Sequence, residues 1–254
     1  MATQTRATLN ISELSAAFPG PNGDLQVLDN ISFKIGASEF VCVLGPSGSG
    51  KSTLLRILGG LLTATKGHVD IDGKRVRRPR RGVGMVFQNS NLMPWRTVLE
   101  NIALPLELQK LPTEQAQQRA GELVDLVGLT GFEDSLPANL SGGMAQRVAI
   151  ARALVHDPEV LLLDEPFGAL DAITRERMGE ELLRIWRVRG KTVLMVTHDI
   201  SEAIFLADRV LVLSDRPAKL KLDLRVDLPR PRKSDMRYTL EFGKLAKLLR
   251  DAIE

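Results

Sequence analysis

A glycine-rich stretch at residues 45–52 carries the strongest chemical pattern in this sequence. It matches a phosphate-binding loop at every fixed position, with a strand-like run before it and a helix expected from about Lys51. Glycines let backbone N–H groups converge on phosphate oxygens, and the positive end of the helix adds to the attraction. Lys51 is expected to reach the β- and γ-phosphates, and the Ser52 hydroxyl suits Mg²⁺. The expected loop residues are Gly45, Pro46, Ser47, Gly48, Ser49, Gly50, Lys51, Ser52 and Thr53.

Two adjacent carboxylates, Asp164 and Glu165, stand where the apolar run at residues 160–163 ends. Ligands of α/β sheets collect at the carboxyl ends of the strands. Asp164 therefore fits a Mg²⁺ site through a water molecule, and Glu165 fits a general base that orients an attacking water. The alternative is a pair that only caps a helix, and the phosphate loop upstream favours the chemical interpretation.

Four short apolar runs predict the strands that position these groups. They lie at residues 40–44, 160–163, 192–196 and 210–213. Helical segments separate them, so we expect a mostly parallel sheet covered by helices on both faces. Residues 7–44 alternate in polarity and contain turn residues at 19–23, which predicts a β-rich start.

A helical region is expected at about residues 92–155. A capping box predicts the start of its first helix, and a threonine and a serine predict the starts of the next two. A proline and a glycine are expected to end the first and the second. The boundary residues are Thr97 with Glu100 and Pro105 for the first helix, Thr113 and Gly128 for the second, and Ser141 for the third.

The tail changes character after Leu224. Residues 229–232 alternate proline with arginine, which indicates a linker. An apolar stripe at helical spacing follows. Its members are Tyr238, Phe242, Leu245 and Leu249. We expect the stripe to pack on the body of the chain, with a partner surface as the alternative.

The composition, 44% hydrophobic and 26% charged over 254 residues, is that of a globular protein. A net charge of +3 does not indicate a nucleic-acid partner, and the arginine cluster at residues 75–81 is interpreted as an exposed loop because no aromatic residue interleaves with it. The single cysteine, Cys42, fits a buried position in a reducing compartment. No run approaches the ~18 apolar residues of a membrane span, and we expect no secretory signal at residues 1–10.

Residues 140–147 resemble the signature motif of the ATP-binding-cassette (ABC) ATPases. Other motifs of that family follow in the expected order over about residues 7–225. They are Phe18 as the aromatic that stacks on adenine, Gln88 in the glutamine loop, residues 168–171 after the acidic pair, and residues 197–199 with the histidine switch. One departure is Ala145, where a basic residue is common. We expect little effect on hydrolysis, because the serine and glycines of the signature make its phosphate contacts.

The resemblance implies an α/β fold with a P-loop NTPase core of the ABC ATPase kind. A mostly parallel sheet flanked by helices would carry an N-terminal antiparallel β subdomain and a helical subdomain. The ATPase domain would span residues 1–225, with the helical subdomain inserted at about 90–155. Residues 226–254 would form a C-terminal linker and an amphipathic helix. The implied reaction is ATP hydrolysis, with ATP and Mg²⁺ as cofactors.

The resemblance also implies a homodimer in which two domains face head to tail. Each nucleotide lies between the phosphate loop of one and the signature of the other. A helix N-terminus attracts anions, which supports this use of the signature, and Ser141 also fits a simple N-cap. The implied catalytic residues are Glu165, His198 and Gln88, and the implied Mg²⁺ ligands are Ser52, Gln88 and Asp164. Ser141, Gly142, Gly143 and Met144 would act on the partner's ATP, and Asp171 would lie in a dimer loop.

Three segments look like the nitrate/sulfonate/taurine branch of bacterial importers. They are residues 91–98, 165–171 and 227–232. This likeness implies a separate membrane permease, a periplasmic or extracellular solute-binding protein, and a peripheral position on the cytoplasmic face of the inner membrane. Leu92, Met93 and Trp95 would contact the permease, with local burial of Trp95 as the alternative. The cargo would be a small anion or organic nutrient that this chain does not touch.

Other classes of P-loop protein fit the sequence less well. Repair ATPases insert a long coiled coil between phosphate loop and signature, and no sustained heptads lie between Lys51 and Ser141. Ribosome-associated relatives carry two cassettes in one chain, and nucleotide kinases lack the signature. An exporter subunit stays an alternative, which the importer-like segments disfavour.

Overall fold

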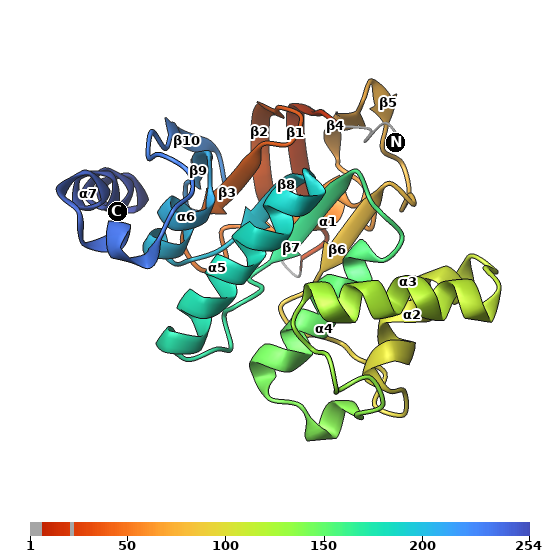
Figure 1. Cartoon of the computed structure of the whole chain (residues 1–254). Helices are drawn as coiled ribbons and strands as arrows, with labels where there is room; N and C mark the ends of the chain where they lie inside the picture. Colours follow the sequence, from red (N-terminus) through yellow and green to blue (C-terminus); the bar gives the residue numbers. More distant parts are fainter. Residues whose placement is uncertain (1–6, 21–22) are drawn as a thin grey trace. The chain divides into compact units, whose positions relative to one another are not determined.

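A computed structural model describes residues 7–20 and 23–254 (Figure 1). The chain forms two compact units, Met1–Arg80 with Gly190–Glu254, and Arg81–Arg189. The first unit contains most of the strands, and the second is mainly helical. None of the helices in the described ranges is long and apolar enough to cross a membrane.

The N-terminal strands of the first unit form an antiparallel sheet in the order β2-β1-β4-β5. The strands are β1 (Leu9–Phe18), β2 (Leu25–Ile35), β4 (Lys66–Ile71) and β5 (Lys74–Arg75). Leu9 and Ile11 of β1 are buried together, because alternate side chains of a strand point to the same face. The expected antiparallel start is confirmed, although residues 21–22 of the predicted turn lie outside the described residues.

The arginine cluster after β4 begins on the surface, as expected. Arg75, Arg77 and Arg78 are exposed. The Nε of Arg75 donates to Oδ1 of Asp70 at 2.9 Å, and an exposed ion pair of this kind contributes little to stability. Arg75, Arg77 and Arg78 are therefore solvated surface residues, as the sequence predicts.

The core strands of the first unit follow the order β10-β9-β3-β8. They are β3 (Phe40–Leu44), β8 (Thr192–Val196), β9 (Arg209–Leu213) and β10 (Leu220–Arg225). β3 is parallel to both β8 and β9, and β10 returns antiparallel beside β9. Every residue of β3 and β8 is buried, which explains their continuous apolar runs. Helix α1 (Lys51–Leu58) packs on β8, and α6 (Ile200–Leu206) packs on β3.

Cys42 lies in the middle of β3 and is fully buried. Burial raises the pKa of its thiol well above the ordinary value, and the nearby Glu202 carboxylate raises it further. The thiol is therefore protonated and shielded from solvent, as expected of a cysteine with a packing role.

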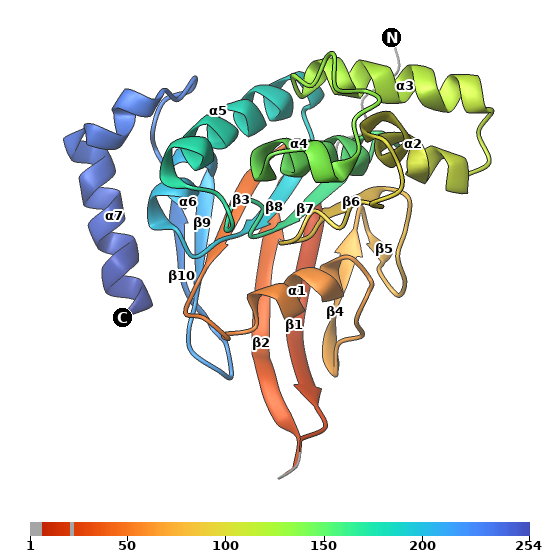
Figure 2. The ribbon, with the colours of Figure 1, turned by 90° about the horizontal axis from the view of Figure 1, so that it is seen from below.

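The C-terminal tail forms a short 3₁₀ helix, η2 (Ser234–Tyr238), and helix α7 (Leu240–Ile253). α7 packs on α6 and β9 (Figure 2). Phe242 and Leu249 of the predicted stripe are buried, so the stripe does pack on the chain itself. The inclusion of Tyr238 is wrong: its side chain is 85% exposed, because it ends η2 before the helical spacing of α7 begins.

The second unit combines one parallel strand pair with a group of helices. The pair is β6 (Val83–Val86) with β7 (Val160–Asp164). The helices are α2 (Val98–Leu108), α3 (Thr113–Leu126), η1 (Pro137–Asn139), α4 (Gly142–Leu154) and α5 (Ala172–Arg189). Helices α2, α3 and α4 pack on one another, and α4 also packs on β6 (Figure 1). The predicted helical region is thereby confirmed.

Several helix boundaries in this unit follow the predicted signals. Thr97 Oγ1 accepts a hydrogen bond from the Glu100 N–H, and the Glu100 carboxylate accepts one from the Thr97 N–H. Gly128, with φ 64°, follows α3, and Ser141 caps α4. The predicted end at Pro105 is wrong, because α2 continues past it to Leu108. The buried packing of α2 outweighs the one hydrogen bond that an internal proline removes.

The start of α3 also differs from the prediction. Pro112 occupies the N-cap and Thr113 is the first helical residue, with no side-chain cap hydrogen bond. Proline is suited to a helix start because its backbone angle is already set and it has no N–H to satisfy. Helix α3 buries Ala116 and Ala120 on its inner face.

Asn101 is the polar centre of the second unit and is fully buried in α2. Its Oδ1 accepts from the Met93 N–H at 2.8 Å. Its Nδ2 donates to the carbonyls of Arg96 and Thr97, both at 2.9 Å, and of Met93 at 3.2 Å. One side chain thus ties the loop before α2 to the helix.

Replacing Asn101 by Ala is expected to destabilise the chain by about 2–4 kcal/mol, because a fully buried side chain and its hydrogen bonds to part-buried backbone groups of the loop are lost. Thermal unfolding should show a clear drop in Tm. Gln117→Ala, an exposed change on α3, is the matched control. Equal Tm values for the two variants would contradict this account.

Candidate functional site

The phosphate loop in the first unit has the backbone that its glycines predict. Gly50 has φ 105° and forms the N-cap of α1. A Cβ at this position would lie 2.6 Å from Cγ1 of Val27 and 2.9 Å from Cδ2 of Leu28, so the loop packs too closely on β2 for any side chain. Glycine at position 50 is thus required by the packing of the loop itself, independently of any bound ligand.

Lys51 and Ser49 give this loop its polar interior. The Nζ of Lys51 donates to the carbonyls of Gly45 at 2.9 Å and Pro46 at 2.8 Å, and the residue is almost fully buried. Ser49 is also buried, and its hydroxyl has no hydrogen-bond partner among the described residues. An unsatisfied buried hydroxyl costs free energy, which a phosphate oxygen could recover. The loop is therefore preorganised for an anion.

Arg216 is a residue of this loop region that sequence analysis missed. Its Nε donates to the Gly48 carbonyl at 3.1 Å, and its Nη2 donates to the same oxygen. Arg216 lies in the turn between β9 and β10. Ala218 connects this turn to β2, because its N–H donates to the Val27 carbonyl and its carbonyl accepts from the Asp29 N–H, both at 2.9 Å. The contact spans 168 residues, so no local pattern could have indicated it.

His198 and the phosphate loop follow two neighbouring strands at the same edge of the sheet. β3 and β8 are parallel, with Val43 opposite Val196, so the residues after both strands emerge together. His198 is exposed. On either side of it, the Thr197 N–H donates to the Val43 carbonyl at 3.1 Å, and Asp199 caps α6. The imidazole is thus presented to solvent from a turn that is fixed at both ends.

Phe18 is half-buried at the end of β1, opposite Leu25 of β2. Leu25 is itself 47% exposed, so this edge offers an apolar surface. Stacking of Phe18 on adenine stays a prediction.

The strand pair of the second unit brings together Gln88 and the acidic pair. β6 and β7 are parallel with Val86 opposite Leu163, so Gln88, two residues after β6, and Asp164, the last residue of β7, lie at the same end of the strand pair. Asp164 is buried and Glu165 is half-buried. Glu165 has φ 44°, a left-handed conformation that costs a non-glycine residue about 1–3 kcal/mol and often marks functional sites. Sequence patterns cannot show this strain, because it belongs to the backbone.

The signature helix α4 begins at Ser141, whose Oγ accepts from the Met144 N–H at 3.3 Å. No acidic residue stands in the first turn, so the positive end of the helix has no built-in counter-charge. Gly143 also has a packing reason, because a Cβ there would lie 3.1 Å from Cγ2 of Thr174, whereas a Cβ on Gly142 would make only an ordinary contact, 3.5 Å from Cδ2 of Leu170. The simple N-cap and the anion-binding interpretation are thus both compatible with this helix end.

Asp171 precedes α5 and accepts a hydrogen bond from the Thr174 N–H at 3.0 Å. Hydrogen bonds from Thr174 lower the pKa of the exposed Asp171 carboxyl. The residue therefore acts as a local cap in this chain, and its place in a dimer loop stays a prediction.

The loop before α2 presents Trp95 to solvent. The indole is 73% exposed, which excludes local burial as its explanation, while Leu92 and Met93 are half-buried. Arg152 fixes the start of the loop through the carbonyls of Ser90 and Asn91 at 2.6 and 2.8 Å, and burial lowers the pKa of its guanidinium. A rigid loop with an outward aromatic is typical of a protein-binding surface.

Comparison with known proteins identifies the family. Residues 28–168 match the family model described as ABC transporter. This chain belongs to the ABC transporter family. It is an ATPase of that family, with the P-loop ABC cassette fold, an antiparallel N-terminal sheet and a helical region.

Curated relatives of this ABC chain include import proteins. The aliphatic sulfonates import ATP-binding protein SsuB of Bacillus cereus is 47% identical over 237 residues, covering 93% of each chain. The nitrate import ATP-binding protein NrtD of Synechocystis is 49% identical over 221 residues, covering 87% of this chain and 83% of the relative. Both support the narrower likeness seen in the sequence.

A solved structure agrees with the ABC fold. The dimeric post-hydrolysis state of the ATP-binding cassette MJ0796, bound to ADP and Pi, is 34% identical with a TM-score of 0.77. It covers 87% of this chain and 100% of its own. That cassette was therefore captured with the products of ATP hydrolysis.

Arg216→Gln is expected to raise KM for ATP by roughly 3–10-fold, since the loop loses charge-assisted hydrogen bonds that each stabilise it by about 1.5–3 kcal/mol at most. The kcat at saturating ATP should change little, because ATP itself reorders the loop. Lys219→Gln is the matched control near the same turn, because the exposed Lys219 side chain pairs with Asp29 and not with the phosphate loop. An unchanged KM in Arg216→Gln would show that the contact does not order the loop.

Proposed function

We propose that this chain is the ATP-hydrolysing subunit that drives import of a small anion or organic nutrient through a separate membrane permease. The preorganised phosphate loop carries the ATPase part: Lys51 is buried in it, and the Ser49 hydroxyl has no partner in the part of the chain that the structure describes. The similarity to sulfonate and nitrate import proteins over most of the chain supports the transport part.

The phosphate-binding roles follow from the loop. Lys51 would bind the β- and γ-phosphates, and the backbone N–H groups of the loop would surround them. Ser52, Gln88 and Asp164 supply hydroxyl, amide and carboxylate oxygens, the donor set that Mg²⁺ prefers. Bound Mg²⁺ would neutralise phosphate charge. Glu165 would orient the attacking water and accept its proton, and His198 would donate a hydrogen bond to the γ-phosphate.

The open end of α4 is proposed to complete the site of a second copy. Ser141, Gly142, Gly143 and Met144 form an N-terminal turn without a counter-charge, suited to the γ-phosphate of a partner's ATP. The dimeric state described for MJ0796 supports a homodimer. In that homodimer Asp171 would lie in the loop between the copies.

The exposed Trp95, with Leu92 and Met93, is proposed as the permease contact. ATP-dependent closure would then move a rigid loop held by Asn101 and Arg152. In this arrangement the chain sits peripherally on the cytoplasmic face of the cell membrane, and a solute-binding protein on the other side delivers the cargo.

Glu165→Gln should lower kcat by about 10²–10⁴-fold, because the general base is lost while the side-chain shape is kept. ATP binding should persist, as measured by equilibrium binding of a fluorescent ATP analogue. Glu122→Gln, an exposed change on α3, is the control. Retained full turnover in Glu165→Gln would remove Glu165 from the mechanism.

Glu165→Gln also tests the proposed nucleotide site between two copies of the chain. Glu165→Gln should change from monomer to dimer on addition of MgATP, as measured by light scattering, because ATP is trapped between the copies. Ser141→Arg introduced into Glu165→Gln should abolish the dimer, since a bulky side chain blocks the helix end. Dimers that survive Ser141→Arg would contradict the role of the signature turn.

A further inference from the structure

The proline–arginine segment at residues 229–232 does more than connect two elements. Arg232 is 5% exposed, and Arg230 is largely covered. Buried arginines are rare and need several acceptors to offset the loss of water. Most of the acceptors here are carbonyls at the C-terminal end of one short helix, α6.

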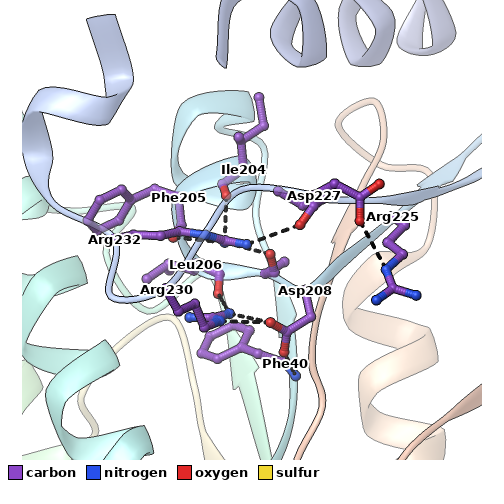
Figure 3. A network of polar contacts seen from close by, with 11 residues as sticks. Phe40, Ile204, Phe205, Leu206, Asp208, Arg225, Asp227, Arg230 and Arg232 are labelled. Carbon is purple, nitrogen blue, oxygen red and sulfur yellow. Dashed lines mark hydrogen bonds and ion pairs between the residues drawn. The ribbon is translucent and has the colours of Figure 1, made fainter. Parts of the chain in front are cut away.

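The last four carbonyls of an α-helix have no partner within the helix. In α6 and its C-cap these belong to Ile204, Phe205, Leu206 and Ala207. The Nη1 of Arg232 donates to Ile204 at 2.9 Å, Phe205 at 3.1 Å and Ala207 at 2.6 Å. The Nη2 of Arg230 donates to the remaining carbonyl, of Leu206, at 2.8 Å (Figure 3). Two tail arginines therefore satisfy all four.

Arg230 also connects this helix end to the core strand. Its Nε donates to Oδ1 of Asp208 at 2.8 Å. Oδ2 of Asp208 accepts from the N–H of Phe40, the first residue of β3, at 2.9 Å. The end of α6 is therefore held against the strand that leads into the phosphate loop.

A third tail arginine holds the other end of α6. The guanidinium of Arg237 lies 4.2 Å from the ring centroid of Phe205. Its Nη1 donates to Oγ of Ser201, in the first turn of α6, at 2.7 Å. Arg230, Arg232 and Arg237 together form what we call the arginine clamp.

Helix α6 positions His198, which immediately precedes its N-cap. The Asp199 carboxylate accepts from the Glu202 N–H at 2.9 Å, and Thr197 Oγ1 accepts from the Asp199 N–H at 3.0 Å. The Thr197 hydroxyl also donates to the buried Glu202 carboxylate. A seven-residue helix is too short to be stable by itself, so this turn depends on what packs around α6.

We propose that the arginine clamp is a positioning device for His198: the tail holds α6 at both ends and so fixes the histidine for the γ-phosphate of ATP. This inference rests on the proposed role of His198. Arg232 is a positioning residue, because it acts through the helix and does not touch the nucleotide. The motif at residues 227–232 would therefore hold α6 in place, which a simple linker does not do.

The clamp is charged under ordinary conditions. Burial, and then the neighbouring Arg230, lower the pKa of Arg232 to about 10, which still leaves its guanidinium protonated at neutral pH. A positive charge at a helix C-terminus is stabilising because it opposes the negative end of the helix dipole. The clamp therefore stabilises α6 through charge as well as through hydrogen bonds.

The first test is Arg232→Gln in the full chain, assayed for MgATP hydrolysis. We expect kcat to fall about ten-fold or more while KM for ATP changes less than two-fold, since a small displacement of a reacting group can lower rates by this amount. Arg232→Lys, which keeps the charge with fewer donors, should give an intermediate kcat. Arg225→Gln, which removes only an exposed pair with Asp227, is the control and should match the wild type. An unchanged kcat in Arg232→Gln would overturn the proposal.

The second test separates the clamp from general destabilisation. If Arg232 acts through His198, adding Arg232→Gln to His198→Ala should lower kcat no further than His198→Ala alone. Fully multiplicative losses would mean that the clamp does not act through the histidine, and would overturn the proposal.

Hydrogen exchange separates this proposal from the proposed catalytic role of His198. Peptides covering residues 197–207 should exchange faster in Arg232→Gln than in Arg225→Gln, with other peptides unchanged. If His198→Ala retains full turnover, the catalytic assignment of the histidine fails, while faster exchange still supports the clamp as the element that orders the turn. Unchanged exchange over residues 197–207 would overturn the clamp itself.

Discussion

The parallel pairing of β3 with both β8 and β9 is the constraint on which the first unit depends. Parallel neighbours end at the same edge, so three segments far apart in the chain emerge side by side. β3 continues into the phosphate loop, β8 into His198, and β9 into the turn that carries Arg216. The strands themselves are almost entirely buried, and these candidate functional residues follow them.

The N-terminal ends of the helices are of two kinds: some have an acidic side chain nearby, and others have none. Helices α2, α3, α6 and α7 each carry a glutamate in the first turn, whose negative charge offsets the positive end of the helix dipole. Helix α5 also has no acid in its first turn, but the Asp171 carboxylate caps its start. Helices α1 and α4 have neither. These two are the phosphate loop helix and the signature helix. The chain therefore leaves a positive helix end open in both places where a phosphate is proposed to bind.

Sequence analysis predicted the buried strands and the phosphate loop well, because both depend on local patterns: continuous apolar runs such as residues 192–196 and fixed glycine positions. It failed where tertiary contacts decide the outcome. Pro105 looked like a helix end, yet the packing of α2 carries the helix past it. Arg216 and Arg232 act on carbonyls far away in the chain, and the strained backbone of Glu165 leaves no trace in residue types.

The burial of Cys42 has a practical consequence for labelling experiments that follow this protein during turnover. Because it is the only cysteine in the chain and its protonated thiol is sealed inside β3, the native surface offers labelling reagents no thiol of its own. A cysteine placed on an exposed turn would therefore accept a fluorophore or spin label without background. Distances between two such reporters, one on each copy of the proposed dimer, could follow its closure and reopening through a complete turnover without first removing a native cysteine.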